Sequence, residues 1–419
     1  MTKAIAIIGT LDTKGEEVAC LRDLIVSRGH PVVVIDAGVL GQPTCRADIP
    51  REAVARAGGG DLGQLIARGD KGHAIQTMMT GSRETLLRLY AEGRLAGAIA
   101  LGGGQGTAIG ASAMQALPIG FPKLMVSTIA SGANTFEPYV GTTDMTLMHS
   151  VADIAGINTI TRRILSNAAA AITGMVDAGD LPETEHSAII GATMLGLTTP
   201  CVLQARAHLE NWGYEVITFH PNGTGGRCLE RLIEEGLIQG AMDLSLQEIT
   251  GYVCQGLFDA GAERLKTASR LGLPQVVAPG GTDYIVLGPL ASLSEDQRSR
   301  PRVIHNPNIT LVRTSREEME RIGQIIASRL NAAIGAVCVL IPTEGFSASN
   351  RPGQAFYNPE ADSGLIEALE GNLAPRIELI KVKAHINDPA FSEVVAKKMH
   401  LLMQEAGLQP AFFSVEENP

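Results

Sequence analysis

The chain has 419 residues and a formal net charge of −10, from 34 Lys and Arg against 44 Asp and Glu. This length predicts more than one domain, and 45% hydrophobic with 19% charged residues excludes an intrinsically disordered chain. We do not expect nucleic acid as a partner, because phosphate contacts need clustered Lys and Arg, which this acidic chain lacks. The six cysteines are scattered, and no apolar run reaches the roughly 18 residues of a membrane span. We therefore expect a cytoplasmic protein without a membrane partner.

Short apolar segments alternate with helical ones from the N-terminus onward. Strands that are apolar throughout are buried on both faces, which is typical of a parallel sheet between layers of helices. The alternation is a βαβ pattern and predicts an α/β fold. The expected strands are residues 4–8, 32–36, 97–101 and 123–128, with helices at 16–28 and 83–92 among the segments between them.

The same pattern restarts near residue 187. Residues 187–191 repeat the run that ends at Gly9, and residues 212–217 repeat 28–33 at almost the same spacing. Two similar α/β halves are therefore expected, although any two βαβ units resemble each other to some extent. The halves are residues 1–180 and 186–419, and the polar stretch 177–185 is the linker between them. Strands at 337–341 and 377–382 are expected to complete the second sheet.

Two glycine-rich loops follow strands in the first half, where parallel sheets bind ligands. In the first loop, a Lys at the start of a helix is poorly placed unless an anion lies there. The alternative for that loop is a plain capping box between Thr13 and Glu16. In the second loop, four glycines in five positions allow an anion-binding nest or serve only a tight turn. The candidate ligand residues are Thr10, Asp12, Thr13 and Lys14 in the first loop, and Gly102, Gly103, Gly104, Gln105, Gly106 and Thr107 in the second.

The second half carries comparable loops, which predict a second cleft for a small anion such as a carboxylate or a phosphate. Its candidate residues are Thr224, Gly225, Gly226, Arg227, Gly280, Gly281 and Asp283. The histidines lie far apart without metal-ligand spacing, so no metal site is expected. His385 and Asp388 stand in a turn-rich loop, which is explained either as a structural turn or as an acid and base lining a cleft.

A long polar stretch lies within the first half at residues 131–144, and loops of this length are usually functional or part of an interface. We expect a helix rich in Met and small apolar residues at 145–156 to follow it. Such a helix is able to pack against another subunit. This segment therefore predicts a homodimer made mainly by the first half.

Several motifs together resemble the Tm-1-like ATP-binding domain family, and the resemblance spans nearly the whole chain. They are residues 9–14, 102–107, 139–144 with 153–156, 191 through 199–200, 223–227 and 385–389. The resemblance implies two Rossmann-like domains, each a mostly parallel sheet flanked by helices, as well as a dimer and ATP bound by the first domain. It implies no established reaction.

The resulting expectation is an ATP-binding protein whose first half holds the phosphates on the two glycine loops, with Mg²⁺ bridging them. Asp36, at the end of the second strand, is a candidate contact to the ribose by analogy with dinucleotide folds. Two functions are compatible with this binding. The protein is either an ATP-dependent enzyme acting on a small anionic metabolite, or a non-catalytic structural or regulatory module. The sequence assigns no catalytic residue.

Overall fold

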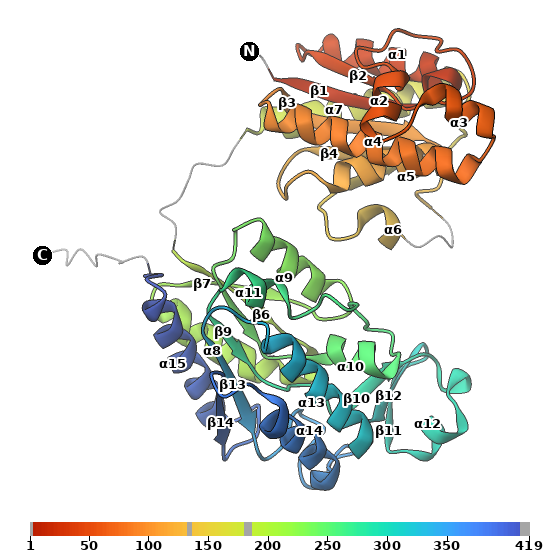
Figure 1. The fold of residues 1–419 in the computed structure, drawn as a ribbon. Helices are drawn as coiled ribbons and strands as arrows, with labels where there is room; N and C mark the ends of the chain where they lie inside the picture. Colours follow the sequence, from red (N-terminus) through yellow and green to blue (C-terminus); the bar gives the residue numbers. More distant parts are fainter. Residues whose placement is uncertain (1–2, 132–135, 180–186, 411–419) are drawn as a thin grey trace, which may run out of the picture. The chain divides into compact units, whose positions relative to one another are not determined.

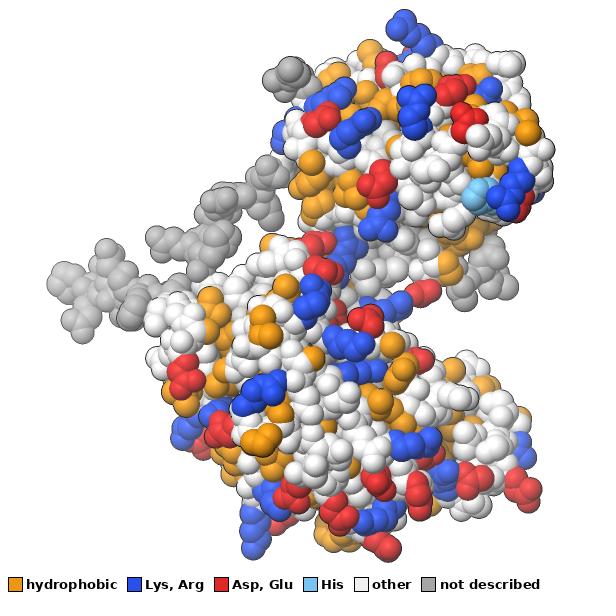
Figure 2. Space-filling model, in the orientation of Figure 1, with side chains coloured by type: hydrophobic (Ala, Val, Ile, Leu, Met, Phe, Trp, Pro, Cys, Tyr) orange, Lys and Arg blue, Asp and Glu red, His pale blue; other side chains and the backbone are white. Residues whose placement is uncertain are grey.

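The computed structural model describes residues 3–131, 136–179 and 187–410 (Figure 1). The chain divides into two compact units, unit 1 (Met1–Pro182) and unit 2 (Glu183–Pro419). Of the expected linker at 177–185, residues 180–185 lie outside the described part of the chain. No helix of the described residues is long and apolar enough to cross a membrane. On the face drawn in Figure 2, the Lys and Arg side chains lie interspersed with Asp and Glu over both units.

Unit 1 is built on one parallel sheet with helices on both faces. Its strands are β1 (Ala4–Gly9), β2 (Val32–Asp36), β3 (Leu95–Gly102), β4 (Lys123–Ser127) and β5 (Thr146–His149). Its helices are α1 (Leu11–Val26), α2 (Arg51–Ala57), α3 (Leu62–Arg68), α4 (Lys71–Ala91), α5 (Gly104–Gln115), α6 (Glu137–Val140) and α7 (Thr159–Asp177). The strands lie in the order β2-β1-β3-β4-β5, and every pair is parallel.

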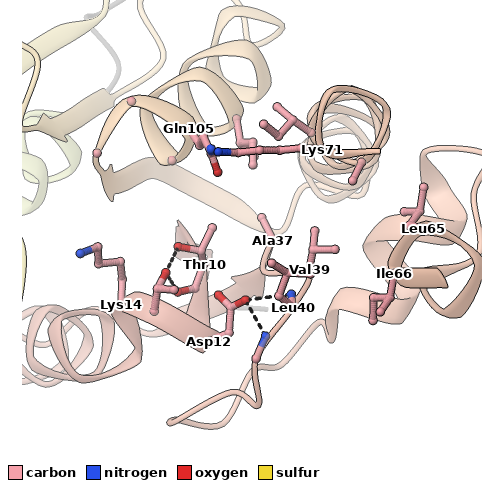
Figure 3. Close-up of a pocket in the computed structure, with 18 of the residues that line it drawn as sticks. Thr10, Asp12, Lys14, Ala37, Val39, Leu40, Leu65, Ile66, Lys71 and Gln105 are labelled. Atoms are coloured by element: carbon pink, nitrogen blue, oxygen red, sulfur yellow. Dashed lines mark hydrogen bonds between the residues drawn. The ribbon is translucent and has the colours of Figure 1, made fainter. Parts of the chain in front are cut away.

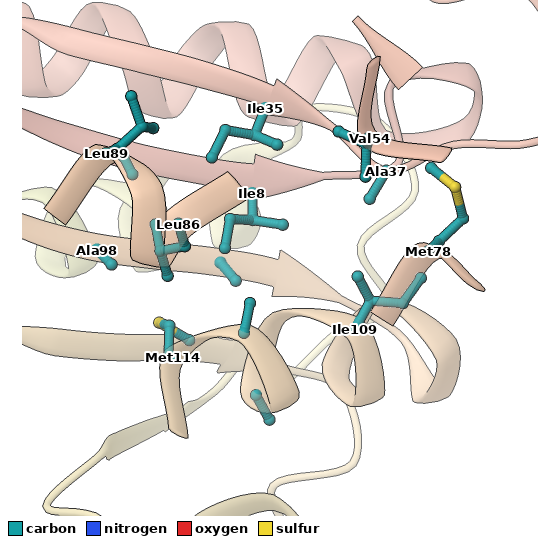
Figure 4. Close-up of a cluster of buried hydrophobic side chains, with 14 of the residues drawn as sticks. Ile8, Ile35, Ala37, Val54, Met78, Leu86, Leu89, Ala98, Ile109 and Met114 are labelled. Carbon is teal, nitrogen blue, oxygen red and sulfur yellow. The ribbon is translucent and has the colours of Figure 1, made fainter. Parts of the chain in front are cut away.

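Alternate residues of the strands face opposite layers of helices. Ile5 and Ile7 of β1 pack with α1 and α7, whereas Ala6 and Ile8 pack with α2, α3, α4 and α5. Figure 4 shows the second of these cores, to which α4 contributes Leu86. Because a strand side chain changes face at every residue, a strand that is apolar throughout fills both cores at once. The expected buried parallel sheet is confirmed.

The expected helix at 145–156 is wrong. Residues 146–149 form β5 instead, paired in parallel with β4 from Leu124 to Ser127. Leu147 packs on one core of unit 1 and Met148 on the other, which is the alternation of a strand. Pairing with β4 and burial against both cores thus override the preference of Met and small residues for a helix. The homodimer loses this support and stays a prediction from the family resemblance.

Unit 2 has a larger parallel sheet and a small antiparallel one. The parallel strands are β6 (Ile189–Thr193), β7 (Glu215–Phe219), β8 (Gly240–Asp243), β9 (Gln275–Val277), β13 (Val337–Pro342) and β14 (Glu378–Val382). Their order is β14-β13-β9-β8-β6-β7, which confirms that the last two strands complete the second sheet. The antiparallel strands β10 (Tyr284–Leu287), β12 (Ile309–Arg313) and β11 (Arg302–Asn306) were not expected.

The helices of unit 2 also lie on both faces of its parallel sheet. One core contains α8 and α15, and the opposite core contains α10, α13 and α14. In both units the first two strands are adjacent and the third lies on the other side of the first. The two α/β halves therefore share a Rossmann-like arrangement. The helices are α8 (Thr199–Asn211), α9 (Gly225–Glu234), α10 (Gln247–Cys254), α11 (Thr267–Leu271), α12 (Glu295–Ser299), α13 (Arg316–Leu330), α14 (Pro359–Asn372) and α15 (Pro389–Glu405), with 3-10 turns η1 (Gly196–Thr198) and η2 (Leu290–Ser292).

Candidate functional site

A cavity of about 740 Å³ lies at the carboxyl ends of β1, β2 and β3 in unit 1 (Figure 3). The chain leaves β1 toward β2 on one side and reaches β3 on the other, so this is the switch point of the sheet. Loops diverge at such a point and leave a crevice that binds ligands in open α/β folds. The cavity is lined by Thr10, Asp12, Thr13, Lys14, Ala37, Val39, Leu40, Gly41, Leu65, Ile66, Gly69, Asp70, Lys71, Ala74, Ile75, Gly103, Gly104, Gln105, Gly106 and Ile109.

The glycine turn after β3 forms one wall of the cavity. α5 begins at Gly104 with Gly103 as its N-cap, so the backbone N–H groups of its first turn lack intrahelical partners. Gly103 through Gly106 line the cavity, whereas Gly102 and Thr107 support the turn from behind. A side chain at Gly102 would meet the Cα of Gly106 at 2.7 Å, and the buried Thr107 hydroxyl pairs with that of Ser127 at 2.7 Å.

The turn after β1 forms the opposite wall, and all four of its predicted residues line the cavity. The Asp12 carboxylate accepts the N–H groups of Leu40 and Gly41, both at 3.1 Å, and thereby fixes the loop after β2. The Thr13 hydroxyl bonds to the hydroxyl of Thr10 at 2.8 Å. α1 begins at Leu11 with Thr10 as its N-cap, and the Thr13 hydroxyl bonds to Thr10, so the alternative of a capping box between Thr13 and Glu16 is not formed.

Lys14 contacts protein as well as the cavity. Its ammonium group donates to the carbonyl of Ile154, and the buried Glu17 carboxylate accepts the N–H of Gly156 at 2.6 Å. The backbone of Lys14 is not helical, with φ −130° and ψ 19°, and this interrupts α1 after its first turn. One function of Lys14 is therefore to hold the loop after β5 against α1.

Asp36 lies beneath the cavity and does not line it. Its Oδ1 accepts the N–H groups of Leu11 at 3.1 Å and Gly38 at 2.8 Å, and the residue is 1% exposed. Burial raises the pKa of this carboxyl, against the effect of the two backbone hydrogen bonds. The structure thus uses Asp36 to join the turns after β1 and β2, and gives it no access to a ribose in the cavity.

Sequence reasoning missed the remaining wall, which comes from α3 and α4. Leu65, Ile66, Ala74 and Ile75 make this wall apolar. Lys71, in the first turn of α4, points toward the first turn of α5 (Figure 3). The available signal was a Lys at a helix N-terminus directly after a Gly-Asp pair, which is the same unfavourable position as that of Lys14.

The predicted anion loop at residues 223–227 is arranged differently. The N–H groups of Gly223 and Gly226 donate to Oε1 of Glu248 at 2.9 and 3.0 Å, and Glu248 is fully buried. A side chain at Gly226 would meet Oε2 of Glu248 at 1.8 Å, so only glycine allows this approach. The anion at this helix start is therefore the protein's own carboxylate.

Arg264 completes that arrangement. Its Nε donates to Glu248 at 2.7 Å, and its other nitrogens contact Asp243 and Glu230. Burial acts to lower the pKa of Arg264, but Asp243 and Glu248 outweigh it and hold the pKa above the ordinary value. Arg227 donates from Nε to the carbonyl of Gly223 at 2.7 Å. The charges in this part of unit 2 therefore pair with one another.

Gly280, Gly281 and Asp283 lie in a different buried cluster. Oδ2 of Asp283 accepts the Ser347 hydroxyl at 2.6 Å, while Oδ1 has no hydrogen-bond partner. Burial raises the pKa of Asp283 to about 6, although the nearby Arg313 acts to lower it. None of the seven residues predicted for the second cleft lines the cavity in unit 1 or the cavity of about 500 Å³ in unit 2. Among the described residues, no group of three or more His, Cys, Asp or Glu is placed to hold a metal ion.

Comparison with known proteins places both units in one family. Residues 3–180 match the N-terminal domain, and residues 187–403 the C-terminal domain, of the "Uncharacterised protein family (UPF0261)". The chain belongs to the UPF0261 family. A UPF0261 protein of Clostridium tetani is 43% identical over 407 residues, which cover 97% of this chain and 100% of that protein. A UPF0261 protein of Rhizobium meliloti is 39% identical over 394 residues, covering 93% and 97%.

The UPF0261 family also connects this chain to a plant protein. The "ToMV susceptible protein tm-1(GCR26)" of Solanum lycopersicum is 35% identical over 426 residues, which cover 96% of this chain and 56% of the tomato protein. This similarity confirms the resemblance seen in the sequence motifs. The family is described as uncharacterised, so membership by itself assigns no ligand and no reaction.

Proposed function

We propose that unit 1 binds ATP in the cavity at the ends of β1, β2 and β3. One observation carries the proposal: the cavity has a polar end with free N–H groups and a cation, and an apolar end of aliphatic side chains. A nucleotide has the same division between phosphates and base. The volume of about 740 Å³ lies within the range of about 300–1,000 Å³ typical of small-molecule sites.

The phosphates would lie against the turn Gly103–Gly106. The N-terminus of a helix combines unpaired N–H groups with a partial positive charge, which favours anions. Lys71 supports this placement, because its ammonium group has no hydrogen-bond or ion-pair partner within the described residues and points toward this turn. A free cation beside free N–H groups is an arrangement that a phosphate satisfies.

The base would lie in the apolar end, between the loop after β2 and helices α3 and α4. Val39, Ile66 and Ile75 offer aliphatic surface to a planar ring. The Asp12 carboxylate fixes this loop through Leu40 and Gly41. Asp36 is left out of the proposed site because it is buried and does not line the cavity.

Mg²⁺ is part of the proposal only as a companion of the phosphates. Asp12 and Asp70 are the carboxylates that line the cavity. Mg²⁺ usually takes one or two carboxylates and otherwise phosphate oxygens and water, so this set fits it. ATP binding in this form agrees with an ATP-dependent enzyme for a small anionic metabolite and with a non-catalytic regulatory module. We assign no catalytic residue.

Calorimetric titration of the full chain with ATP and with NAD tests the proposal. The loops lack the glycine spacing of a dinucleotide site, so we expect ATP to bind and NAD to bind much more weakly. At ATP about 100-fold above its dissociation constant, the stabilisation should approach about 2.7 kcal/mol. Adenosine is the matched control, because it offers the base without the phosphates. Equal binding of NAD and ATP would contradict the assignment.

A further inference from the structure

Unit 2 contains a second cavity, of about 500 Å³, which none of the residues predicted from the sequence lines except His385 and Asp388. It lies at the carboxyl ends of the neighbouring strands β13 and β14. Three segments build it: residues 343–345 after β13, residues 351–366, which include the first turns of α14, and the loop 385–388 after β14. This edge of a parallel sheet is the position at which α/β folds bind small molecules.

Arg351 is held in place at the wall of this cavity. Its Nη2 donates to Nδ1 of His385 at 2.9 Å and to the Asp388 carboxylate at 2.6 Å. The Nε2 of His385 donates to the carbonyl of Ser347 at 2.8 Å, and these partners assign a neutral imidazole with its proton on Nε2. Burial lowers the pKa of His385, and the charge of Arg351 lowers it further.

Both nitrogens of His385 are therefore occupied, so it is not available as a base. Its contribution, with that of Asp388, is to fix the guanidinium group of Arg351. A guanidinium group restrained through one nitrogen loses little freedom when its other nitrogens bind a ligand.

The unused polar groups of the cavity define what it can bind. Arg351 has no partner for Nε and Nη1 within the described residues, and its side chain is 44% exposed. The Glu344 carboxylate and the Tyr357 hydroxyl line the same cavity, and neither has a partner in the described part of the chain. The site therefore presents two guanidinium nitrogens as donors, one carboxylate acceptor and one hydroxyl group to a ligand.

The charges around the cavity narrow the class of ligand. Asp362 is paired with Arg313, and Asp388 with Arg351, so Glu344 remains the uncompensated charge. A carboxylate matches the fork of donors on a guanidinium group. A phosphate dianion is a poorer match, because it would bring a second negative charge beside the uncompensated Glu344 carboxylate.

We infer that this cavity binds a small organic acid, with its carboxylate on Arg351 and an adjacent hydroxyl or ammonium group donating to Glu344. The inference concerns unit 2 alone and does not depend on ATP binding by unit 1. Hydroxy acids and amino acids share the required chemistry, and the experiment distinguishes them.

Calorimetric titration of the full chain with a matched set of three-carbon acids tests the inference. Lactate carries the hydroxyl group, alanine the ammonium group, and propionate neither. Gluconate and glutamine extend the same two groups into a larger molecule. We expect one of the two pairs, lactate with gluconate or alanine with glutamine, to bind at least about 10-fold more tightly than propionate. If no probe binds better than propionate at roughly 10 mM, the inference is wrong.

Variants separate this site from non-specific binding. Glu344→Gln changes an unpaired, exposed side chain, so the fold should be kept while affinity for the best acid falls about 10- to 150-fold. Arg351→Gln should also weaken the binding of propionate, because it removes the partner of the carboxylate. Lys383→Gln is the control, because Lys383 is exposed and lies outside the cavity. Unchanged affinity in Glu344→Gln would overturn the inference. The affinity of unit 2 for the acid should be the same with and without ATP. A failure of this inference can therefore be told apart from a failure of the ATP proposal.

Discussion

Two glycine-rich helix starts, one in each unit, look alike in sequence and differ in structure. The turn Gly103–Gly106 presents its N–H groups to a cavity in unit 1. The turn Gly223–Gly226 presents its N–H groups to Glu248, which Arg264 neutralises in turn. The free N–H groups of the helix start thus bond to a carboxylate of the protein itself in unit 2, whereas in unit 1 they face a cavity.

This difference teaches that a glycine-rich turn identifies a place for an anion without saying whose anion it is. Helix N-termini favour negative charge from a ligand and from a side chain alike. Whether the turn is left open for a ligand depends on whether a carboxylate from elsewhere in the chain reaches it. Glu248 does so from α10, 22 positions from Gly226 in sequence.

Removal of the internal carboxylate should give the largest effect. Glu248→Ala leaves Arg264 with one fewer buried partner and two buried N–H groups without an acceptor, so we expect a loss of about 3–5 kcal/mol in stability. Trp212 is the chain's single Trp and lies in unit 2, so urea unfolding followed by its fluorescence reports this unit. Glu263→Ala is the control, because Glu263 is exposed and, in the part of the chain that the structure describes, pairs with the exposed Lys266. A loss below about 1 kcal/mol would show that the network is not needed.

Placing a carboxylate in the open turn should make unit 1 resemble unit 2. Gly104→Asp should reduce ATP affinity by about 100-fold or more, because like charges in contact cost several kcal/mol. Gly104→Ala is the control, since a Cβ there meets no atom within 4 Å and both variants should fold. Titration calorimetry measures the ATP affinity of both variants. If Gly104→Asp binds ATP as the wild type does, the phosphates lie elsewhere.

Lys71 tests the polar end of the cavity from its other side. Lys71→Met should lower ATP affinity by about 10- to 150-fold, the loss of a charged hydrogen bond, and should leave the unliganded protein as stable as before. The control is Arg83→Met, which removes a cation from an exposed position of the same helix outside the cavity. An equal loss of ATP affinity in the two variants would indicate a general effect of charge and no specific contact of Lys71.

The smallest effect concerns the buried carboxyl groups of unit 2. The pKa of Asp283 is raised to about 6 by burial, whereas the unfolded chain has its ordinary value near 3.9. The folded state therefore binds more protons between these values, and unit 2 should lose about 2 kcal/mol of stability as pH rises from about 4 to 6. Asp283→Asn should remove this part of the pH dependence, and the exposed Asp296→Asn should keep it. Unfolding monitored by Trp212 across that range measures it.

Most of the fold could be predicted because it depends on local sequence. Strands that are apolar throughout indicate a doubly covered parallel sheet, and the structure contains two of them. The antiparallel strands β10, β11 and β12 escaped prediction because the edge strand β11 is largely exposed and has no apolar run. The local sequence of β5 predicts a helix, because the strand is decided by tertiary contacts: its pairing with β4 and its packing on both cores of unit 1.

The candidate site could be predicted only in part. The turns after β1 and β3 were found because the carboxyl ends of strands are recognisable in sequence. Lys71, Leu65 and Ile75 come from the helices between β2 and β3, and no local rule says that these helices reach the edge of the sheet. The Gly223–Arg227 loop was assigned to a ligand because the approach of Glu248 is a tertiary contact.

The two anion positions also differ in when they are complete during synthesis. The Arg264 network joins side chains between positions 230 and 264, whereas the cavity of unit 1 needs segments from Thr10 to Ile109. Contacts between nearby residues form with little loop closure, and domains fold as units while the chain emerges. The helix start at Gly223–Gly226 can therefore bind the Glu248 carboxylate while the chain is still being synthesised. The helix start of unit 1 has to wait until that unit is built, and under the ATP proposal its occupancy then depends on the nucleotide concentration around it.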